Sequence, residues 1–169
     1  MTAKQVDKAV KLSVLTALSV LGRIGFAYIP FFKPVSAMVV VAGMTLGPGY
    51  GFACGAMSAL ISNFVFGQGL WTPFQMLAWG IIGLMSGLCG PVLRRSRWIM
   101  IPWGMLSGIT FSLIMDVFTT LWMDGGFNLS RYIVLIMAAL PVTAVYMLSD
   151  ALFLWIAWGK TKRAVGSEE

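Results

Sequence analysis

Long stretches without a charged side chain limit most strongly how this chain can fold. The run from Phe74 to Leu93 contains no charged residue, and the run from Trp98 to Trp122 contains only Asp116. A helix of about 20 apolar residues crosses the hydrocarbon core of a bilayer. The chain is 59% hydrophobic and 11% charged, against the ~25% charged residues of a soluble domain. We therefore predict an integral membrane protein.

The apolar runs and the turns between them predict one all-α domain over residues 1–169, a compact bundle of six transmembrane helices. The sequence GPGYG, residues 47–51, interrupts one long apolar stretch, so we expect two short helices there. A re-entrant pair at this place would leave the downstream topology unchanged. The predicted spans are 6–22, 35–46, 52–66, 74–93, 98–122 and 132–158.

The distribution of basic residues predicts the orientation, because cytoplasmic loops carry an excess of Lys and Arg. With six crossings, Arg23, Lys33 and Arg131 fall on one side and the other nine basic residues on the opposite side. We therefore expect both termini to be cytoplasmic. The net charge of +6 then reflects membrane orientation, and we expect no nucleic-acid partner. The nine residues are Lys4, Lys8, Lys11, Arg94, Arg95, Arg97, Lys160, Lys162 and Arg163.

The composition also argues against several classes of enzyme. The chain has no histidine, which excludes a Ser-His triad and a histidine zinc motif. Cys54 and Cys89 lie in apolar runs, so we expect no metal and no intrinsic cofactor. The sequence GKT at residues 159–161 lacks the upstream glycine of a phosphate-binding loop. Asp116 and Asp150 fall at depths in opposite leaflets, which disfavours a paired-carboxylate mechanism.

The segment NFVFGQGLWTPFQMLAWG, residues 63–80, carries polar side chains at a predicted outer turn. An aromatic surface beside amide groups is typical of a small-molecule site, although a capped turn with an interfacial Trp would explain the same residues. Asp116 lies seven residues before Met123, which places it about 10 Å below the outer surface. An acid at that depth is expected to face a cavity, water or a partner such as Arg23.

The outer loops, residues 23–34 and 124–132, supply aromatic, polar and glycine residues that suit a mobile lid, or an ordinary interfacial loop. We combine them with the polar segment in one predicted substrate-binding site. Its residues are Arg23, Tyr28, Phe31, Asn63, Gln68, Trp71, Thr72, Gln75, Trp79, Asp116, Asn128, Arg131 and Tyr132.

Small residues recur every four positions on the first predicted helix, at Ala9, Ser13 and Ala17. Small side chains at this spacing allow another helix to approach closely in a membrane. Packing within the chain and an external helical partner both explain the stripe.

Taken together, the six short-looped helices, the small-residue stripe and the segment from Gly47 to Gly83 resemble the substrate-binding S components of energy-coupling factor (ECF) vitamin transporters. The sequence GQGLWTPFQMLAWG, residues 67–80, is similar to the cobalamin-type S components. The resemblance implies a multi-pass protein of the bacterial cell membrane that captures a vitamin, with cobalamin first. Another vitamin or a queuosine-like precursor is the alternative, and a structural membrane protein without a ligand is a further one.

The resemblance also implies partners. A transmembrane coupling subunit would contact Ala9, Ser13 and Ala17, and two cytoplasmic ATPase subunits would hydrolyse ATP. The chain itself would be a transporter subunit and no enzyme, and the bound vitamin would be its substrate. Residues 23–34 match the lid of this family, and residues 63–75 and 116–132 match the walls of its binding site.

Overall fold

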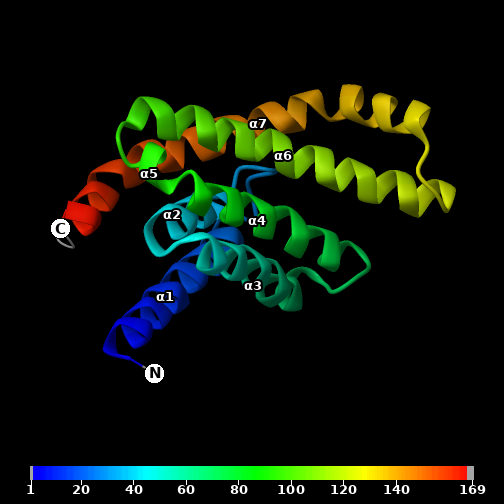
Figure 1. Cartoon of the computed structure of the whole chain (residues 1–169). Coiled ribbons are helices and arrows are strands. Elements are labelled where there is room, and N and C mark those ends of the chain that lie inside the picture. The colour runs from blue at the N-terminus through cyan, green and yellow to red at the C-terminus, as the bar shows by residue number, and fades with distance from the viewer. Residues whose placement is uncertain (1, 167–169) are drawn as a thin grey trace.

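The computed structural model describes residues 2–166 of the chain, and within these residues the regular structure is entirely helical. The predicted all-α fold is confirmed for this part of the chain. The side chains of Lys160, Lys162 and Arg163, which entered the prediction of orientation, lie outside the described residues. The helices are α1 (Ala3–Gly25), α2 (Val35–Leu46), α3 (Pro48–Phe66), α4 (Trp71–Leu88), α5 (Gly90–Leu93), α6 (Arg97–Asp124) and α7 (Leu129–Gly166) (Figure 1).

Proline and glycine explain where these helices begin and end. Pro48 occupies the first turn of α3, where its missing N–H is not needed, so α3 starts earlier than the predicted residue 52. The predicted span 74–93 is divided at Cys89 into α4 and the short α5. Pro91 explains this break, because its ring clashes with the carbonyl of Gly87 in a continuous helix.

Three of the described helices are long and apolar enough to cross a membrane: α3, α6 and residues 129–159 of α7. The apolar α2 is shorter. Six crossings and cytoplasmic termini therefore remain predictions. In Figure 1 the start of α1, the end of α7 and the α5–α6 turn lie at the left, while the α3–α4 and α6–α7 turns lie at the right. The first three of these features therefore lie at the end opposite the α3–α4 and α6–α7 turns, while the α1–α2 loop lies between the two ends (Figure 1).

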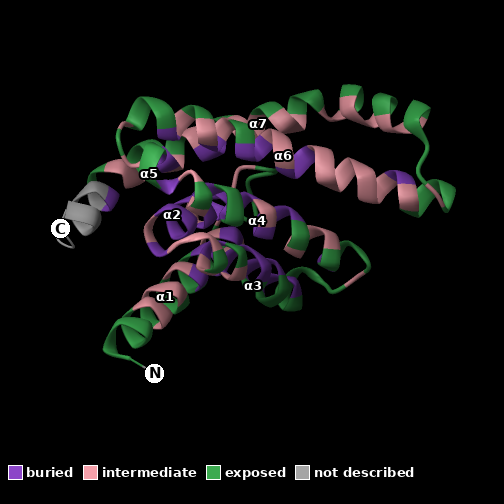
Figure 2. Ribbon diagram, viewed as in Figure 1, coloured by how far each residue is buried: buried purple, intermediate pink, exposed green. Residues whose placement is uncertain are grey.

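The helix α2 forms the centre of the fold. Ten of its twelve residues are buried, and it packs against α1, α3, α4, α6 and α7. A helix that is apolar on every side is stable only when other elements surround it. Figure 2 shows the buried residues concentrated on α2 and on the parts of α3 and α4 beside it.

Glycines allow α2, α3 and α4 to approach one another closely. A Cβ added to Gly83 would overlap the carbonyl oxygen of Gly51, and one added to Gly51 would lie 2.6 Å from the Cα of Gly43. Gly55 is equally constrained, because its Cβ would overlap the backbone of Trp79. Small residues have this role in many membrane helix bundles, where close backbone packing replaces the hydrophobic effect.

The helices α6 and α7 form a long antiparallel hairpin, whose outer end extends beyond α4 (Figure 1). A hydrogen bond of 2.7 Å between the Ser112 and Thr143 hydroxyls joins the two helices. The hairpin contacts α2, α4 and α5, and α7 also contacts the loop 26–34. It therefore forms a second unit beside the closely packed helices α1 to α4. A cavity lies at the boundary between the two units.

The contact between Gly51 and Gly83 leads to a stability prediction. We expect Gly83→Ala to destabilise the protein by about 1–3 kcal/mol, because the new methyl group meets the backbone of α3, which cannot move aside as a flexible side chain would. The thermal unfolding midpoint of the protein purified in detergent measures the effect. Gly49→Ala is the matched control, since a Cβ at Gly49 would meet nothing within 4 Å. Equal midpoints for the two variants would contradict the close contact.

Candidate ligand-binding site

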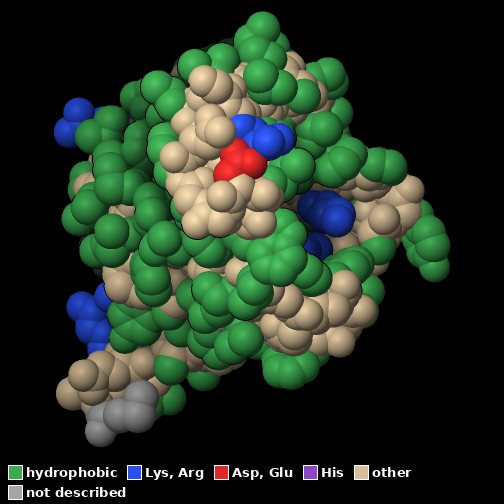
Figure 3. Space-filling model, turned by 90° about the vertical axis from the view of Figure 1, so that its right-hand side faces the viewer, with side chains coloured by type: hydrophobic (Ala, Val, Ile, Leu, Met, Phe, Trp, Pro, Cys, Tyr) green, Lys and Arg blue, Asp and Glu red, His purple; other side chains and the backbone are tan. Residues whose placement is uncertain are grey.

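A cavity of about 310 Å³ lies between the α6–α7 hairpin and the helices α1, α2 and α4, with the loop 26–34 on its edge. Small-molecule sites typically have volumes of about 300–1,000 Å³. The space-filling view of the end that holds the α6–α7 turn shows basic side chains in a hollow beside hydrophobic surface (Figure 3). The polar residues that line the cavity are Arg23, Lys33, Ser36, Gln75, Ser112 and Asp116.

Arg23 reaches the cavity from the last turn of α1, and its side chain is buried, with 7% of its surface exposed. Its Nη1 donates to the Ser62 hydroxyl and to Asn63 Oδ1, at 2.9 Å from the latter, and its Nη2 lies 3.4 Å from Gln75 Oε1. The guanidinium carbon lies 5.0 Å from the ring centroid of Trp79, in a cation–π contact. Among the described residues Arg23 forms no ion pair with an acid. The ion pair with Asp116 that the sequence left open is therefore not formed.

Asn63 is the centre of a hydrogen-bond network among the polar side chains at the α3–α4 turn. Its side chain is fully buried at the end of α3, and its Nδ2 donates to Thr72 Oγ1 and to Gln75 Oε1, both at 2.9 Å. The Thr72 hydroxyl donates to Gln68 Oε1 at 3.0 Å, and Gln68 Nε2 donates to the Leu60 carbonyl at 3.0 Å. These side chains satisfy one another, as buried polar groups must. Together they fix the start of α4 against the end of α3.

Gln75 connects this network to the cavity. Its Oε1 accepts from both Arg23 and Asn63, which determines which end of the amide is the oxygen. Its Nε2 forms no hydrogen bond with any described residue. Because Gln75 lines the cavity, this amide is available to donate to an acceptor on a ligand.

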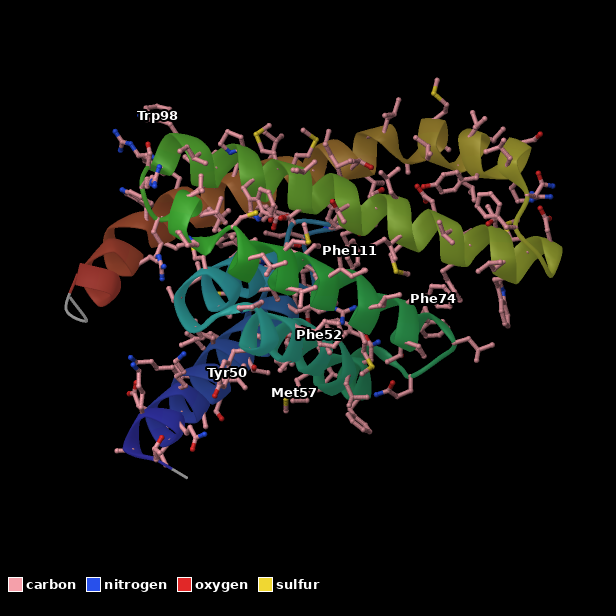
Figure 4. The ribbon with its side chains drawn as sticks, in the orientation of Figure 1. Tyr50, Phe52, Met57, Phe74, Trp98 and Phe111 are labelled. Atoms are coloured by element: carbon pink, nitrogen blue, oxygen red, sulfur yellow. The ribbon has the colours of Figure 1, made fainter. Side chains whose placement is uncertain are left out.

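Aromatic side chains make the apolar wall. Trp79 of α4 stacks on Phe111 of α6, with ring centroids 4.6 Å apart, and its Nε1 donates to the Ser36 hydroxyl at 3.3 Å. Phe111 points from α6 toward α4 (Figure 4). Tyr146 of α7 contacts the edges of both Phe111 and Phe31, which closes the wall between the hairpin and the loop 26–34. Phe31 adopts a left-handed φ of 62°, a conformation that is costly for a bulky residue.

The two membrane acids lie closer to one site than their predicted depths suggest. Asp116 lines the cavity, and its Oδ2 is buried without a hydrogen-bond partner among the described residues. Asp150 is 2% exposed and lies against the Ser36 hydroxyl and the Ala37 N–H, where α2 begins. Since Ser36 lines the cavity, Asp150 lies directly behind its wall. Tyr146 is within electrostatic range of both acids. Asp150 itself does not line the cavity, so the two acids do not meet on its wall.

Five of the residues predicted from the sequence line the cavity, namely Arg23, Phe31, Gln75, Trp79 and Asp116. Asn63, Gln68 and Thr72 form the supporting network behind Arg23 and Gln75. The remaining predicted residues, Tyr28, Trp71, Asn128, Arg131 and Tyr132, do not line it.

These five residues have other surroundings. Tyr28 is 96% exposed, and Trp71 at the start of α4 is 40% exposed. The Arg131 Nε donates to Asp124 at 2.6 Å, and the Asn128 side chain caps α7 by accepting from the Arg131 N–H at 3.1 Å. The Tyr132 hydroxyl lies 3.4 Å from the Leu113 carbonyl. The outer ends of α6 and α7 therefore use their polar residues to build their own turn.

Several wall residues were absent from the predicted set. Lys33 belongs to the predicted lid, and its position close to Phe31 in the sequence could have indicated that it lines the cavity. Ser36 and Ser112 are small hydroxyl residues that occur throughout membrane helices, so their types alone do not indicate a site. Phe111 and Tyr146 lie in the middle of apolar spans. Of these two residues, only Tyr146 carries a feature that indicates a site, because its hydroxyl group needs a polar environment at that depth.

A family model provides the classification. The model of the substrate-specific component of ECF transporters matches residues 7–165. The chain belongs to this family. The resemblance to ECF S components is thereby confirmed, and this S component is a multi-pass protein of the cell membrane that serves as a transporter's substrate-binding subunit and not as an enzyme. Its partners are the membrane and ATPase subunits of the transporter and a small-molecule substrate. No solved structure matches the chain.

The network around Asn63 leads to a second stability prediction. We expect Asn63→Ala to destabilise the S component by about 1–3 kcal/mol, because Arg23, Thr72 and Gln75 each lose a buried hydrogen-bond partner. Thermal unfolding in detergent measures the change. Thr119→Ala is the control, since the one partner of the Thr119 hydroxyl among the described residues is the Met115 carbonyl of its own helix. A larger loss for Thr119→Ala than for Asn63→Ala would argue against the network.

Proposed function

We propose that this S component captures a vitamin-sized molecule from the outer side of the membrane, in the cavity between α4 and the α6–α7 hairpin. The observation that carries the proposal is the cavity itself, in which hydrogen-bond donors, an acid and an aromatic wall meet at one place in an otherwise apolar chain. Apolar pockets with a few convergent polar groups are the usual form of ligand sites. The proposal includes six crossings and cytoplasmic termini, which place the site toward the exterior.

Cobalamin is the first ligand to test, because residues 67–80 are similar to the cobalamin-type S components. A smaller vitamin or a queuosine-like precursor is the second candidate, and the cavity volume of about 310 Å³ favours it. A corrinoid macrocycle with its nucleotide loop is larger than this cavity. It would enter only if the loop 26–34 moved away from α7, where the Ser149 hydroxyl donates to the Lys33 carbonyl at 3.0 Å.

The same proposal assigns the energy-coupling contact to α1. Ser13 and Ala17 are exposed and Ala9 is half-buried. The Ser13 hydroxyl donates to the Ala9 carbonyl of its own helix at 3.0 Å, so its polarity is satisfied without a partner. Exposed apolar side chains, among them Val10 and Val14, continue the same surface. A coupling-subunit helix could therefore pack closely against Ala9, Ser13 and Ala17, while two ATPase subunits hydrolyse ATP.

Ligand capture gives the third prediction. We expect Gln75→Ala to weaken binding of the captured vitamin by about ten-fold, because the variant removes the amide donor on the cavity wall and two of the contacts that hold Arg23 and Asn63. Equilibrium binding of cobalamin and a vitamin panel to the purified chain measures this. Trp71→Ala tests the wider site predicted from the sequence. An equal loss of binding affinity in this variant would extend the site to the α3–α4 turn. A chain that binds no vitamin would instead support a purely structural membrane protein.

Coupling gives the fourth prediction. We expect Ala17→Leu to reduce ATP-driven uptake by the assembled transporter about ten-fold while ligand affinity stays unchanged, because a bulky side chain separates two closely packed helices. Uptake into vesicles and ligand binding are measured in parallel. Ala138→Leu is the matched control, since Ala138 is exposed on α7, which does not contact α1. Full transport by Ala17→Leu would remove this surface from the interface.

A further inference from the structure

We propose that the captured ligand carries an anionic group, a carboxylate or a phosphate, that binds between Arg23, Lys33 and Gln75. This inference rests on the proposed function, because it takes the cavity to be the ligand site. It specifies the chemistry of the ligand at one wall of that site.

Two cations meet at this wall. The Arg23 guanidinium lies 5.0 Å and the Lys33 Nζ 5.2 Å from the centroid of the same Phe66 ring, so the two positive charges flank one aromatic side chain. Burial, and secondarily the charge of Arg23, lowers the pKa of Lys33, which sits in the loop 26–34. Within the described residues neither cation forms an ion pair. Two like charges held together in a poorly solvated site repel each other unless an anion joins them.

The acids of the region do not supply that anion. Asp116 lines the cavity from α6 and is the only acid among the described wall residues, so the formal charges of the wall are two positive and one negative. Asp150 lies behind Ser36, against the Ala37 N–H at the first turn of α2. A carboxylate at a helix N-terminus is stabilised by that helix and not by the cations of the cavity. One negative charge on a ligand would neutralise the net charge of the wall.

The hydrogen-bond donors of the wall are also available. Arg23 uses Nη1 fully on Ser62 and Asn63, whereas its Nε has no hydrogen bond to a described residue. Gln75 Nε2 and Lys33 Nζ likewise have none. Charge-assisted hydrogen bonds from such donors to a carboxylate or phosphate are the strong kind. The neutral acceptors Ser62, Asn63 and Gln75 hold Arg23 in place without neutralising it.

The position of Lys33 favours a ligand site over a purely structural role for the two cations. Arg23 also joins α1 to α3 and α4, so its burial alone could serve the fold. The Lys33 side chain forms no hydrogen bond with a described residue and contacts α3 through the Phe66 ring, yet it is half-buried at the cavity wall. Its carbonyl, and not its ammonium group, makes the contact with α7. A substitution of Lys33 therefore changes the charge of the wall and removes the contact with the Phe66 ring, while the backbone contact with α7 stays in place.

The test compares acids with their neutral counterparts on the purified full chain in detergent. The pairs are pantothenate and panthenol, nicotinate and nicotinamide, biotin and biotin amide, and pyridoxal phosphate and pyridoxal, with cyanocobalamin as a separate arm. Any molecule retained during purification is identified by mass spectrometry and added with a neutral analogue. We expect the bound ligand to be an acid that binds at least about ten-fold more tightly than its neutral counterpart. The carboxylate and phosphate pairs tell the two anion types apart.

Variants complete the test. Lys33→Gln should lower the affinity for the acid about ten-fold and leave the affinity for the neutral counterpart unchanged, whereas Lys33→Arg should retain most of the affinity. Arg95→Gln, an exposed basic residue at the α5–α6 turn, is the matched control and should change neither. A ligand that is neutral or cationic, or one that Lys33→Gln binds as tightly as the parent chain does, overturns this inference and leaves the proposed function intact. A chain that binds and retains no small molecule overturns both.

Discussion

The structure depends on a buried arginine that forms no ion pair with an acid within residues 2–166. Arg23 is held by the Ser62 hydroxyl, the Asn63 and Gln75 amides and the Trp79 ring, so one cation joins α1, α3 and α4. Neutral partners hold the guanidinium in place without cancelling its charge. That charge is consequently directed at whatever occupies the neighbouring cavity.

Two kinds of helix packing produce that cavity. Glycine contacts bring α2, α3 and α4 so close together that no space remains between them. The α6–α7 hairpin instead approaches α4 through large aromatic side chains, with Trp79 stacked on Phe111 and Tyr146 behind it. Close packing on one side gives the wall rigidity, and the larger side chains on the other side leave a space beside it. The loop 26–34 lies across the edge of this space and connects to α7 through the Lys33 carbonyl.

The polar turn between α3 and α4 shows how much of the site could be predicted from residue types alone. Its composition favoured either a capped turn or a binding surface, and of its residues Gln75 lines the cavity. Its composition did not show that Asn63, Gln68 and Thr72 would satisfy one another, because hydrogen-bond partners depend on side-chain direction. In the same way, Asp124 and Arg131 belong to a loop of the predicted lid, and the structure pairs them with each other and not with the cavity.

The sequence by itself determined that the chain is helical and belongs in a membrane, and its motifs indicated the ECF S-component family. These properties follow from hydrophobic length, from glycine and proline at the helix ends, and from local patterns, all of which act over neighbouring residues. Only the tertiary structure decided that Lys33, Phe111 and Tyr146 share a cavity with Arg23 and Asp116. Their meeting depends on how the α6–α7 hairpin packs beside α4, a long-range arrangement that no local pattern specifies.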